Sequence, residues 1–414
     1  MKPDALLIAG LAIVVLGVLT GQPLMVAPGM LLVAVVTIAG LWTLEAVSTS
    51  VDCRVHLASH KARWATEIEG HVAVENAQPL PLPWLDVRAE WPVELPVLKG
   101  TMQASHKPGR REFRCLLSLR WFERVSRRFR VRCLDRGEYL FGPVEMVFGD
   151  PFGFYEQRKL TGSIERLVVY PRTVAVTWEG VLSRSPFGDR AMQSWVFDDP
   201  SYARGAREYL PTDPFSRIDW KATARTSTLH TRFLDAAFCV EVAFVVNVST
   251  AEAVTDGIDR DLLERTLVVS ASLASACHQA GYRFGVYTNG LVRQSPHPAA
   301  VNMGEGPAHL DNCMQVLGRL LPMHGARCET VLDATCGKTS DRARVVLVTG
   351  IVTPNLVRAV ERQALRGRSV AIVATAPGFS RMTHTAPRAV SMFSVSEQEA
   401  WNELEHVTIR KARR

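Results

Sequence analysis

Two consecutive apolar runs near the N-terminus constrain this chain more than any other feature. Residues 5–20 and 24–44 are almost purely apolar, and the turn-forming residues Gly21, Gln22 and Pro23 separate them. Each run approaches the roughly 20 residues that a helix needs to cross the hydrocarbon core of a bilayer. Because the spacer is so short, the two helices must run antiparallel. We therefore predict a transmembrane helical hairpin over residues 1–46.

A cleavable signal peptide is the alternative interpretation of the first run. Only Lys2 precedes that run, and a second apolar run follows it, which a signal peptide does not need. A hairpin leaves both of its ends on one side of the membrane, and Arg54, Lys61 and Arg63 follow the second run. The positive-inside rule then predicts a two-helix anchor in the cell (inner) membrane, with the lipid bilayer as a partner and the bulk of the chain cytoplasmic.

Composition agrees with an anchored protein that carries a large folded body. The sequence is 47% apolar and 21% charged, which is typical neither of a disordered chain nor of one embedded entirely in lipid. The net charge is only +7, and the basic residues at 410–414 have no interleaved aromatic side chains, so we expect no nucleic-acid partner. The eight cysteines form no Cys-x-x-Cys pair and lie mostly in apolar runs, which indicates reduced, buried thiols.

Residues 47–170 alternate between apolar and polar side chains, as half-buried strands do. Pro-rich and Gly-rich clusters, such as residues 78–83 and 107–109, interrupt the alternation. Short strands with frequent turns predict an antiparallel β-sandwich. The expected strands include 71–75, 84–90, 111–120 and 127–133.

Residues 237–414 alternate between apolar strands and amphipathic helices. Such alternation predicts an open α/β sheet, which binds ligands at the carboxyl ends of its strands, so the chain as a whole is expected to be multi-domain. The expected strands are 240–249, 282–288, 343–349 and 369–375, and the expected helices are about 258–280, 309–321 and 356–365.

Residues 171–236 are expected to connect these two domains and contain a dense polar motif. Asp213 before Pro214 is typical of a helix start, because the proline needs no N–H donor there. Helical spacing would then place Arg217, Lys221 and Arg225 on one face. Such a helix could lock two domains together, which we favour, or it could hold an anionic partner.

This motif resembles the hallmark of the domain of unknown function 58 family. The turn at Asp150–Gly153 and the two N-terminal apolar helices also match that family's layout, so the resemblance covers essentially the whole chain. The residues that carry the resemblance are Arg207, Tyr209, Asp213, Arg217, Ile218, Asp219, Trp220, Lys221, Ala224 and Arg225.

The resemblance implies a C-terminal part similar to von Willebrand factor A domains. It also implies a MoxR-type AAA+ ATPase as partner, because members of the family are commonly encoded beside such ATPases. The expected function is therefore that of a membrane-tethered adaptor or scaffold, which acts with the ATPase in assembling or remodelling protein complexes.

Von Willebrand factor A domains hold a divalent metal through an Asp-x-Ser-x-Ser motif after the first strand and an Asp from a later loop. Here the corresponding positions are Asn247, Ser249 and Ala251, and Gly350 follows Thr349 where the later Asp is expected. A hard divalent cation prefers charged oxygen ligands. We therefore expect a degenerate site and no metal or other cofactor.

No set of residues in the sequence identifies a catalytic centre. The apparent phosphate-binding loop that ends at Gly337–Thr339 has Leu332 in place of its required first glycine. We name no catalytic residue and expect a non-enzymatic protein. Two alternatives stay open: a membrane-associated metal-dependent hydrolase, and an envelope-structure protein that binds anionic lipid.

Overall fold

The structure of the 414-residue chain is a computed structural model. It describes residues 3–48, 51–98, 102–105, 107, 109–162, 164–179, 198–209, 218, 220–236, 241–252, 257–341, 343–377, 391–396 and 399–411. The chain divides into two compact units. The first is formed mainly by residues 1–172 and the second mainly by residues 173–414.

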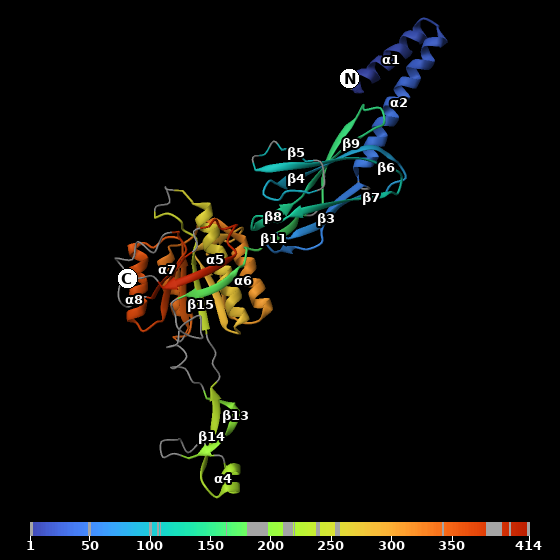
Figure 1. Ribbon diagram of the computed structural model, residues 1–414. Helices are drawn as coiled ribbons and strands as arrows, with labels where there is room; N and C mark the ends of the chain where they lie inside the picture. The colour runs from blue at the N-terminus through green and yellow to red at the C-terminus, as the bar shows by residue number, and fades with distance from the viewer. Residues whose placement is uncertain are drawn as a thin grey trace. The chain divides into compact units, whose positions relative to one another are not determined.

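Two apolar helices begin the first unit (Figure 1). Helix α1 spans Pro3–Leu19 and helix α2 spans Pro23–Ser48. A Cβ atom on Gly10 would lie 2.8 Å from the side chain of Val33, so the absence of a side chain lets the antiparallel helices approach closely. Among the described helices, α2 alone is long and apolar enough to span a membrane, over residues 23–41 with a mean hydropathy of 2.4.

The rest of the first unit is β-rich, as the alternation of apolar residues predicts. Its sheets have the strand orders β1-β3-β7, β10-β9-β4-β6-β5 and β2-β11-β8. The strands are β1 Val51–Leu57, β2 Lys61–Ala62, β3 Glu67–Asn76, β4 Leu82–Pro92, β5 Met102–Ala104, β6 Arg110–Leu119, β7 Arg124–Arg132, β8 Gly137–Phe141, β9 Val144–Gly149, β10 Glu156–Thr161 and β11 Glu165–Val169.

One hydrophobic core joins these sheets. The fully buried indole of Trp91 on β4 meets Phe129 on β7 at 4.8 Å and Phe141 on β8 at 4.7 Å between ring centroids, both edge-on. Trp91 therefore contacts a strand from each of the other two sheets. Alternate residues of these strands point inward, which is why the sequence alternates between apolar and polar side chains.

The second unit contains a mixed eight-stranded sheet with helices. Its strand order is β12-β23-β22-β21-β20-β15-β16-β18, and the five strands from β22 to β16 run parallel to one another. The strands in this unit are β12 Ala175–Glu179, β13 Asp198–Glu208, β14 His230–Ala236, β15 Glu241–Asn247, β16 Arg283–Thr288, β17 Gly290–Val292, β18 Ala300–Gly304, β19 Leu320–His324, β20 Arg344–Thr349, β21 Val370–Ala374, β22 Ser391–Val395 and β23 His406–Lys411.

Helices cover the buried parallel strands. Helices α7 and α8 pack on Ala243 and Val245 of β15 and on the neighbouring strands. Val242, Phe244 and Val246 point the other way and are equally buried, which explains the near-continuous apolar run in the sequence. The helices are α4 Trp220–Thr226, α5 Arg260–Gln279, α6 Pro307–Arg319, α7 Cys328–Lys338 and α8 Pro354–Leu365.

The sequence analysis does not predict several elements of the second unit, β12 and α7 among them. Residues 175–179, assigned to the connecting segment, form β12 and pair in parallel with β23, so this part of the connector belongs to the sheet. Helix α7 was overlooked, although Cys328, Leu332 and Cys336 recur every four residues and all pack in the core. That recurrence is a signal of an amphipathic helix.

Candidate functional site

The polar residues predicted from the sequence lie at the carboxyl ends of two adjacent parallel strands. Asn247 ends β15 and lies opposite Thr349, which ends β20. The Nδ2 atom of Asn247 donates a hydrogen bond to Oγ1 of Thr349 over 3.0 Å. Both side chains are buried, with exposed fractions of 4% and 0%. Adjacent parallel strands therefore bring together residues that lie about a hundred positions apart in the sequence.

The side-chain oxygen of Asn247 is fully engaged by the protein. It accepts hydrogen bonds from the backbone N–H of Ser249 over 3.1 Å and from Nδ2 of Asn289 over 2.9 Å. A carboxamide oxygen has two lone pairs, and both are used here. The group is also neutral, whereas a divalent cation prefers charged oxygens that are free to coordinate it.

Asn289, which the sequence analysis did not identify, completes this network. It follows β16 and is fully buried. Its Oδ1 accepts from the backbone N–H of Val248 over 2.8 Å, and its Nδ2 also lies 3.3 Å from Oγ of Ser249. An asparagine directly after an apolar strand was the available signal, since ligand sites of open α/β sheets lie at such strand ends.

Gly350 faces a different part of the structure from the other three predicted metal positions. Asn247, Ser249 and Ala251 line one pocket, whereas a Cβ atom on Gly350 would lie 2.8 Å from Cγ of Leu262 on α5. An aspartate at position 350 would therefore have to displace Leu262 before it could join the other three.

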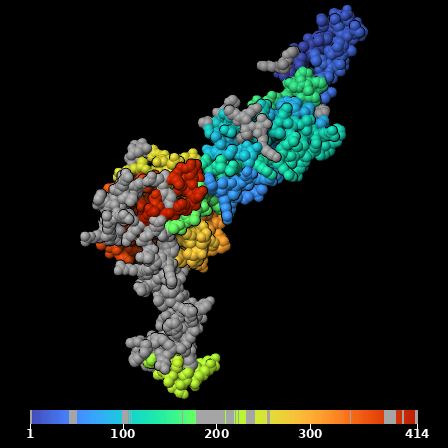
Figure 2. Space-filling view, viewed as in Figure 1, coloured from blue at the N-terminus to red at the C-terminus, as the bar shows by residue number. Residues whose placement is uncertain are grey.

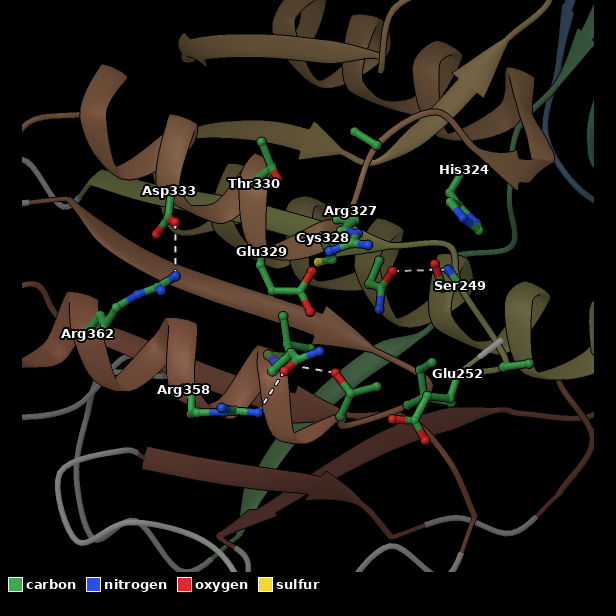
Figure 3. A pocket seen from close by; sticks show the side chains of 17 residues that line it. Ser249, Glu252, His324, Arg327, Cys328, Glu329, Thr330, Asp333, Arg358 and Arg362 are labelled. Carbon is green, nitrogen blue, oxygen red and sulfur yellow. Dashed lines mark hydrogen bonds and ion pairs between the residues drawn. The ribbon is translucent and has the colours of Figure 1, made fainter. Parts of the chain in front are cut away.

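The pocket lined by these residues has a volume of about 740 Å³ (Figure 3). Its walls come from the segment after β15, the end of β19, and the first turns of α7 and α8. The N-terminal N–H groups of a helix carry a partial positive charge, and here two helices begin at one pocket. The side chain of Thr353 caps α8 by accepting from the N–H of Leu356, whereas Arg327 at the start of α7 makes no side-chain cap.

The charged side chains of the pocket are only partly neutralised. Arg362 pairs with Asp333 over 3.2 Å, and Gln363 donates to the same carboxylate over 2.6 Å. Arg358 instead donates to the side-chain oxygen of Asn355 over 2.8 Å. Within the described part of the chain, no carboxylate forms an ion pair with Arg358 or Arg327, and both are exposed.

Acidic groups balance these arginines from other sides of the pocket. Figure 3 shows Glu329 beside Arg327 at the start of α7, and Glu252 across the pocket from them. The resulting surface presents both signs of charge, and two of its arginines have no carboxylate partner among the residues that the structure describes. Such a surface can receive a carboxylate through paired N–H donors while it offers acceptors to cations nearby.

The cysteine of the pocket is not an activated nucleophile. Cys328 lines the pocket, but the thiol is buried and burial raises its pKa, so the reactive thiolate is disfavoured. Among the residues that the structure describes, no group of three or more His, Cys, Asp and Glu side chains is placed to hold a metal ion.

The signature motif lies in a separate part of the second unit. Arg207 is on β13, which pairs with β14, and Tyr209 follows that strand. Helix α4 begins at Trp220, whose side chain is 68% exposed, and Lys221 and Arg225 on the same helix are exposed as well. Asp213, Arg217 and Asp219 lie outside the described residues. The domain lock that we favoured for this motif stays a prediction.

The chain is similar to known proteins over parts of its length. The chain is 24% identical over 257 residues to the uncharacterized protein YeaD of Bacillus subtilis (strain 168), and the alignment spans 58% of each protein. A CARDB domain from Pyrococcus furiosus is 13% identical, with a TM-score of 0.20, over 29% of this chain and 86% of that one. A non-cellulosomal cohesin from Archaeoglobus fulgidus is 13% identical, with a TM-score of 0.21, over 29% of this chain and 91% of the cohesin chain.

The family match falls on the segment that carries the signature motif and most of the α/β sheet. Residues 205–383 match the family described as "Protein of unknown function DUF58". This range contains every residue of the motif from Arg207 to Arg225, as well as Asn247, Asn289 and Gly350. The similarity to the DUF58 family is thus carried by residues 205–383 of this chain.

Proposed function

We propose that this protein is a membrane-tethered adaptor that faces the cytoplasm. In this proposal α1 and α2 cross the cell membrane together as a hairpin. Helix α2 supplies a span of 19 apolar residues, and the shorter α1 packs along it through Gly10 and Gly29. The basic residues that follow α2 and the free, mostly buried thiols of the described part of the body support a cytoplasmic orientation.

The α/β domain, which we take to be of the von Willebrand factor A type, would hold a protein partner at the 740 Å³ pocket. The observation that carries this proposal is the pair of pocket arginines, Arg327 and Arg358, that have no carboxylate partner among the described residues. The neighbouring edge of the sheet is filled by the Asn247–Asn289 network, so the partner is held by direct contacts and not through a bridging metal. An acidic segment of a MoxR-type AAA+ ATPase is the proposed occupant.

A charge-reversal pair tests this assignment. The full-length protein in detergent is titrated with a purified MoxR-type ATPase from the same organism, and the Kd is measured by biolayer interferometry. Arg358→Glu should raise the Kd by at least about tenfold, the equivalent of about 1.4 kcal/mol. Arg366→Glu is the matched control, because this exposed arginine caps the opposite end of the same helix. Its Kd should stay within about twofold of the wild-type value.

Two results would count against the proposal in different ways. If Arg358→Glu and Arg366→Glu changed the Kd equally, the partner would have to bind outside the pocket. Undetectable binding of every such ATPase would remove the proposed partner while leaving the pocket open to another acidic protein.

A further inference from the structure

The loop between β9 and β10 carries three aromatic residues in four positions: Phe152, Phe154 and Tyr155. Asp150 fixes the shape of this loop from within. Its carboxylate is fully buried and accepts hydrogen bonds from the backbone N–H of Phe152 over 2.8 Å and of Tyr155 over 2.6 Å. Because a carboxylate that accepts two backbone N–H groups closes the turn, the loop presents its rings in one arrangement.

Two further contacts make the loop rigid. A Cβ atom on Gly149 would lie 2.1 Å from the carbonyl oxygen of Tyr155, so only glycine lets the strand end and the returning chain approach this closely. The indole N–H of Trp84 donates to the carbonyl oxygen of Asp150 over 3.2 Å. Nevertheless Phe152 is 62% exposed, and the ring of Phe154 stacks on it with the two ring centroids 5.6 Å apart. The fold thus holds an apolar ring in an exposed position.

The same hairpin is attached to the end of α2. The Cβ position of Gly40 lies 3.1 Å from the ring of Tyr155, so the tyrosine packs directly on the helix. Beyond the helix, Lys159 donates to the carbonyl oxygen of Val51 over 3.2 Å, and Thr161 donates to the carboxylate of Asp52 over 2.8 Å. Figure 1 shows this hairpin beside the lower part of α2. The height of the loop along α2 is therefore set by contacts on both sides of the helix end.

This height lies close to the end of the apolar run. Gly40 lies four residues before the end of the run 24–44, so Tyr155 packs about 6 Å, roughly one helical turn, from that end. A span of 19 residues is about 28 Å long, close to the thickness of a hydrocarbon core. If α2 crosses the membrane as proposed above, the aromatic loop lies where hydrocarbon gives way to headgroups.

We propose that the Asp150–Tyr155 loop is seated in the interfacial layer of the bilayer, with Phe152 as its inserted side chain. This inference rests on the proposed membrane tether. Aromatic rings favour the interface because their apolar bodies and polar edges match its two sides. The outer face of β10 fits the same setting, since it exposes Leu160 by 71%, an apolar group, beside the exposed ion pair of Arg158 with Glu156. The loop thereby docks the β-rich domain on the membrane at a second point besides the helices.

Three single-cysteine labels test this placement in the full-length protein. A nitroxide is attached to Phe152→Cys, to Trp121→Cys and to Leu31→Cys after reconstitution into phosphatidylcholine and phosphatidylglycerol vesicles. Trp121 is the matched control, because it is an exposed aromatic residue, 61% exposed, at the turn between β6 and β7 of the same domain. Leu31 is 66% exposed on α2 and reports on the helix alone. Wild-type protein treated in the same way gives the labelling background of the native thiols.

The ratio of collisions with oxygen to collisions with a water-soluble nickel complex reports the depth of each label. The proposal expects a ratio several-fold higher at position 152 than at position 121, and a ratio at position 31 that is at least as high as at 152. A lipid-like ratio at 31 with equal, water-like ratios at 152 and 121 would overturn the loop proposal and leave the tether intact. A water-like ratio at 31 would overturn the tether and this inference with it. A label at 152 that is shielded from both reagents would assign the loop to a protein partner instead.

Discussion

Nδ2 of Asn289 donates a hydrogen bond to Oδ1 of Asn247 over 2.9 Å at the carboxyl edge of the central sheet. Asn247 ends β15 and Asn289 directly follows the adjacent parallel strand β16, and each also accepts a hydrogen bond from a backbone N–H of the segment 248–249. A strand edge that could hold a charged ligand is thereby closed by neutral groups that satisfy one another. The partly neutralised charges lie beside it, on the first turns of α7 and α8.

The first prediction concerns metal binding. Because both lone pairs of Asn247 Oδ1 are used, the full-length protein in detergent should give no heat of binding with magnesium or manganese by calorimetric titration. Asn247→Asp supplies the charged oxygen and should bind weakly. Adding Gly350→Asp to this variant should not strengthen metal binding, since the new aspartate side chain would meet Leu262. Tight binding by the wild-type protein would reverse this view of the site.

The second prediction concerns Asn289 and the stability of the α/β sheet. Asn289→Ala removes the acceptor of the buried N–H of Val248 and one of the two donors to the oxygen of Asn247. The free energy of opening β15 should therefore fall by about 2–3 kcal/mol. Native-state hydrogen exchange of peptides from β15 and β20 measures this change. The control is Asn355→Ala, which removes one bond to an exposed arginine and should change the opening free energy by under about 0.5 kcal/mol. Equal protection in both variants would contradict the role given to Asn289.

The third prediction separates the packing of Trp91 from its polar atom. Trp91 is fully buried between Phe129 and Phe141, so Trp91→Ala should destabilise the β-rich domain by about 3–5 kcal/mol. The indole N–H finds no acceptor among the described residues. Trp91→Phe removes that N–H but keeps an aromatic ring. Its loss of unfolding free energy should therefore be less than half of the loss caused by Trp91→Ala. Urea unfolding of the two variants gives both values, and equal losses would show that the N–H matters more than the ring.

The fourth prediction concerns acid stability through Asp86. Burial by itself raises the pKa of this carboxyl, but hydrogen bonds and ion pairs with Arg114 and Arg88 outweigh burial, and its pKa lies below the ordinary value. Because the folded-state pKa is lowered, Asp86 contributes stability above its unfolded pKa of about 3.9 and loses it as the pH falls through the folded value. Asp86→Asn should lower the stability of the β-rich domain at neutral pH and flatten its decline below about pH 4.

Urea unfolding at a series of pH values measures this dependence. Glu69→Gln provides the matched control, because Glu69 pairs with Arg130 on the solvent face of the same domain, where its side chain is 59% exposed. That variant should keep the wild-type pH profile, since exposed ion pairs contribute little. A profile for Asp86→Asn that parallels the wild type would refute the linkage.

Local patterns in the sequence determined many of the strands and helices of this protein. The alternation of residues 71–75 and 84–90 placed them in β3 and β4, and the apolar run at 240–249 gave β15. Two breaker residues also marked ends correctly: Pro23 begins α2, and Gly281, with a φ of +73°, follows α5. These features depend on the periodicity of side chains along one segment, which every segment carries in its own sequence.

The positions of the site residues relative to one another depend on tertiary structure alone. Nothing local relates Asn247 to Asn289 or Thr349, because their proximity follows from which strands become neighbours and in which register. The convergence of α7 and α8 on one pocket, the absence of a carboxylate partner for Arg327 and Arg358 among the described residues, and the contact between Tyr155 and Gly40 are likewise non-local. A sequence pattern fixes the direction of each side chain relative to its own strand or helix. Only the packing of distant segments determines what that side chain meets.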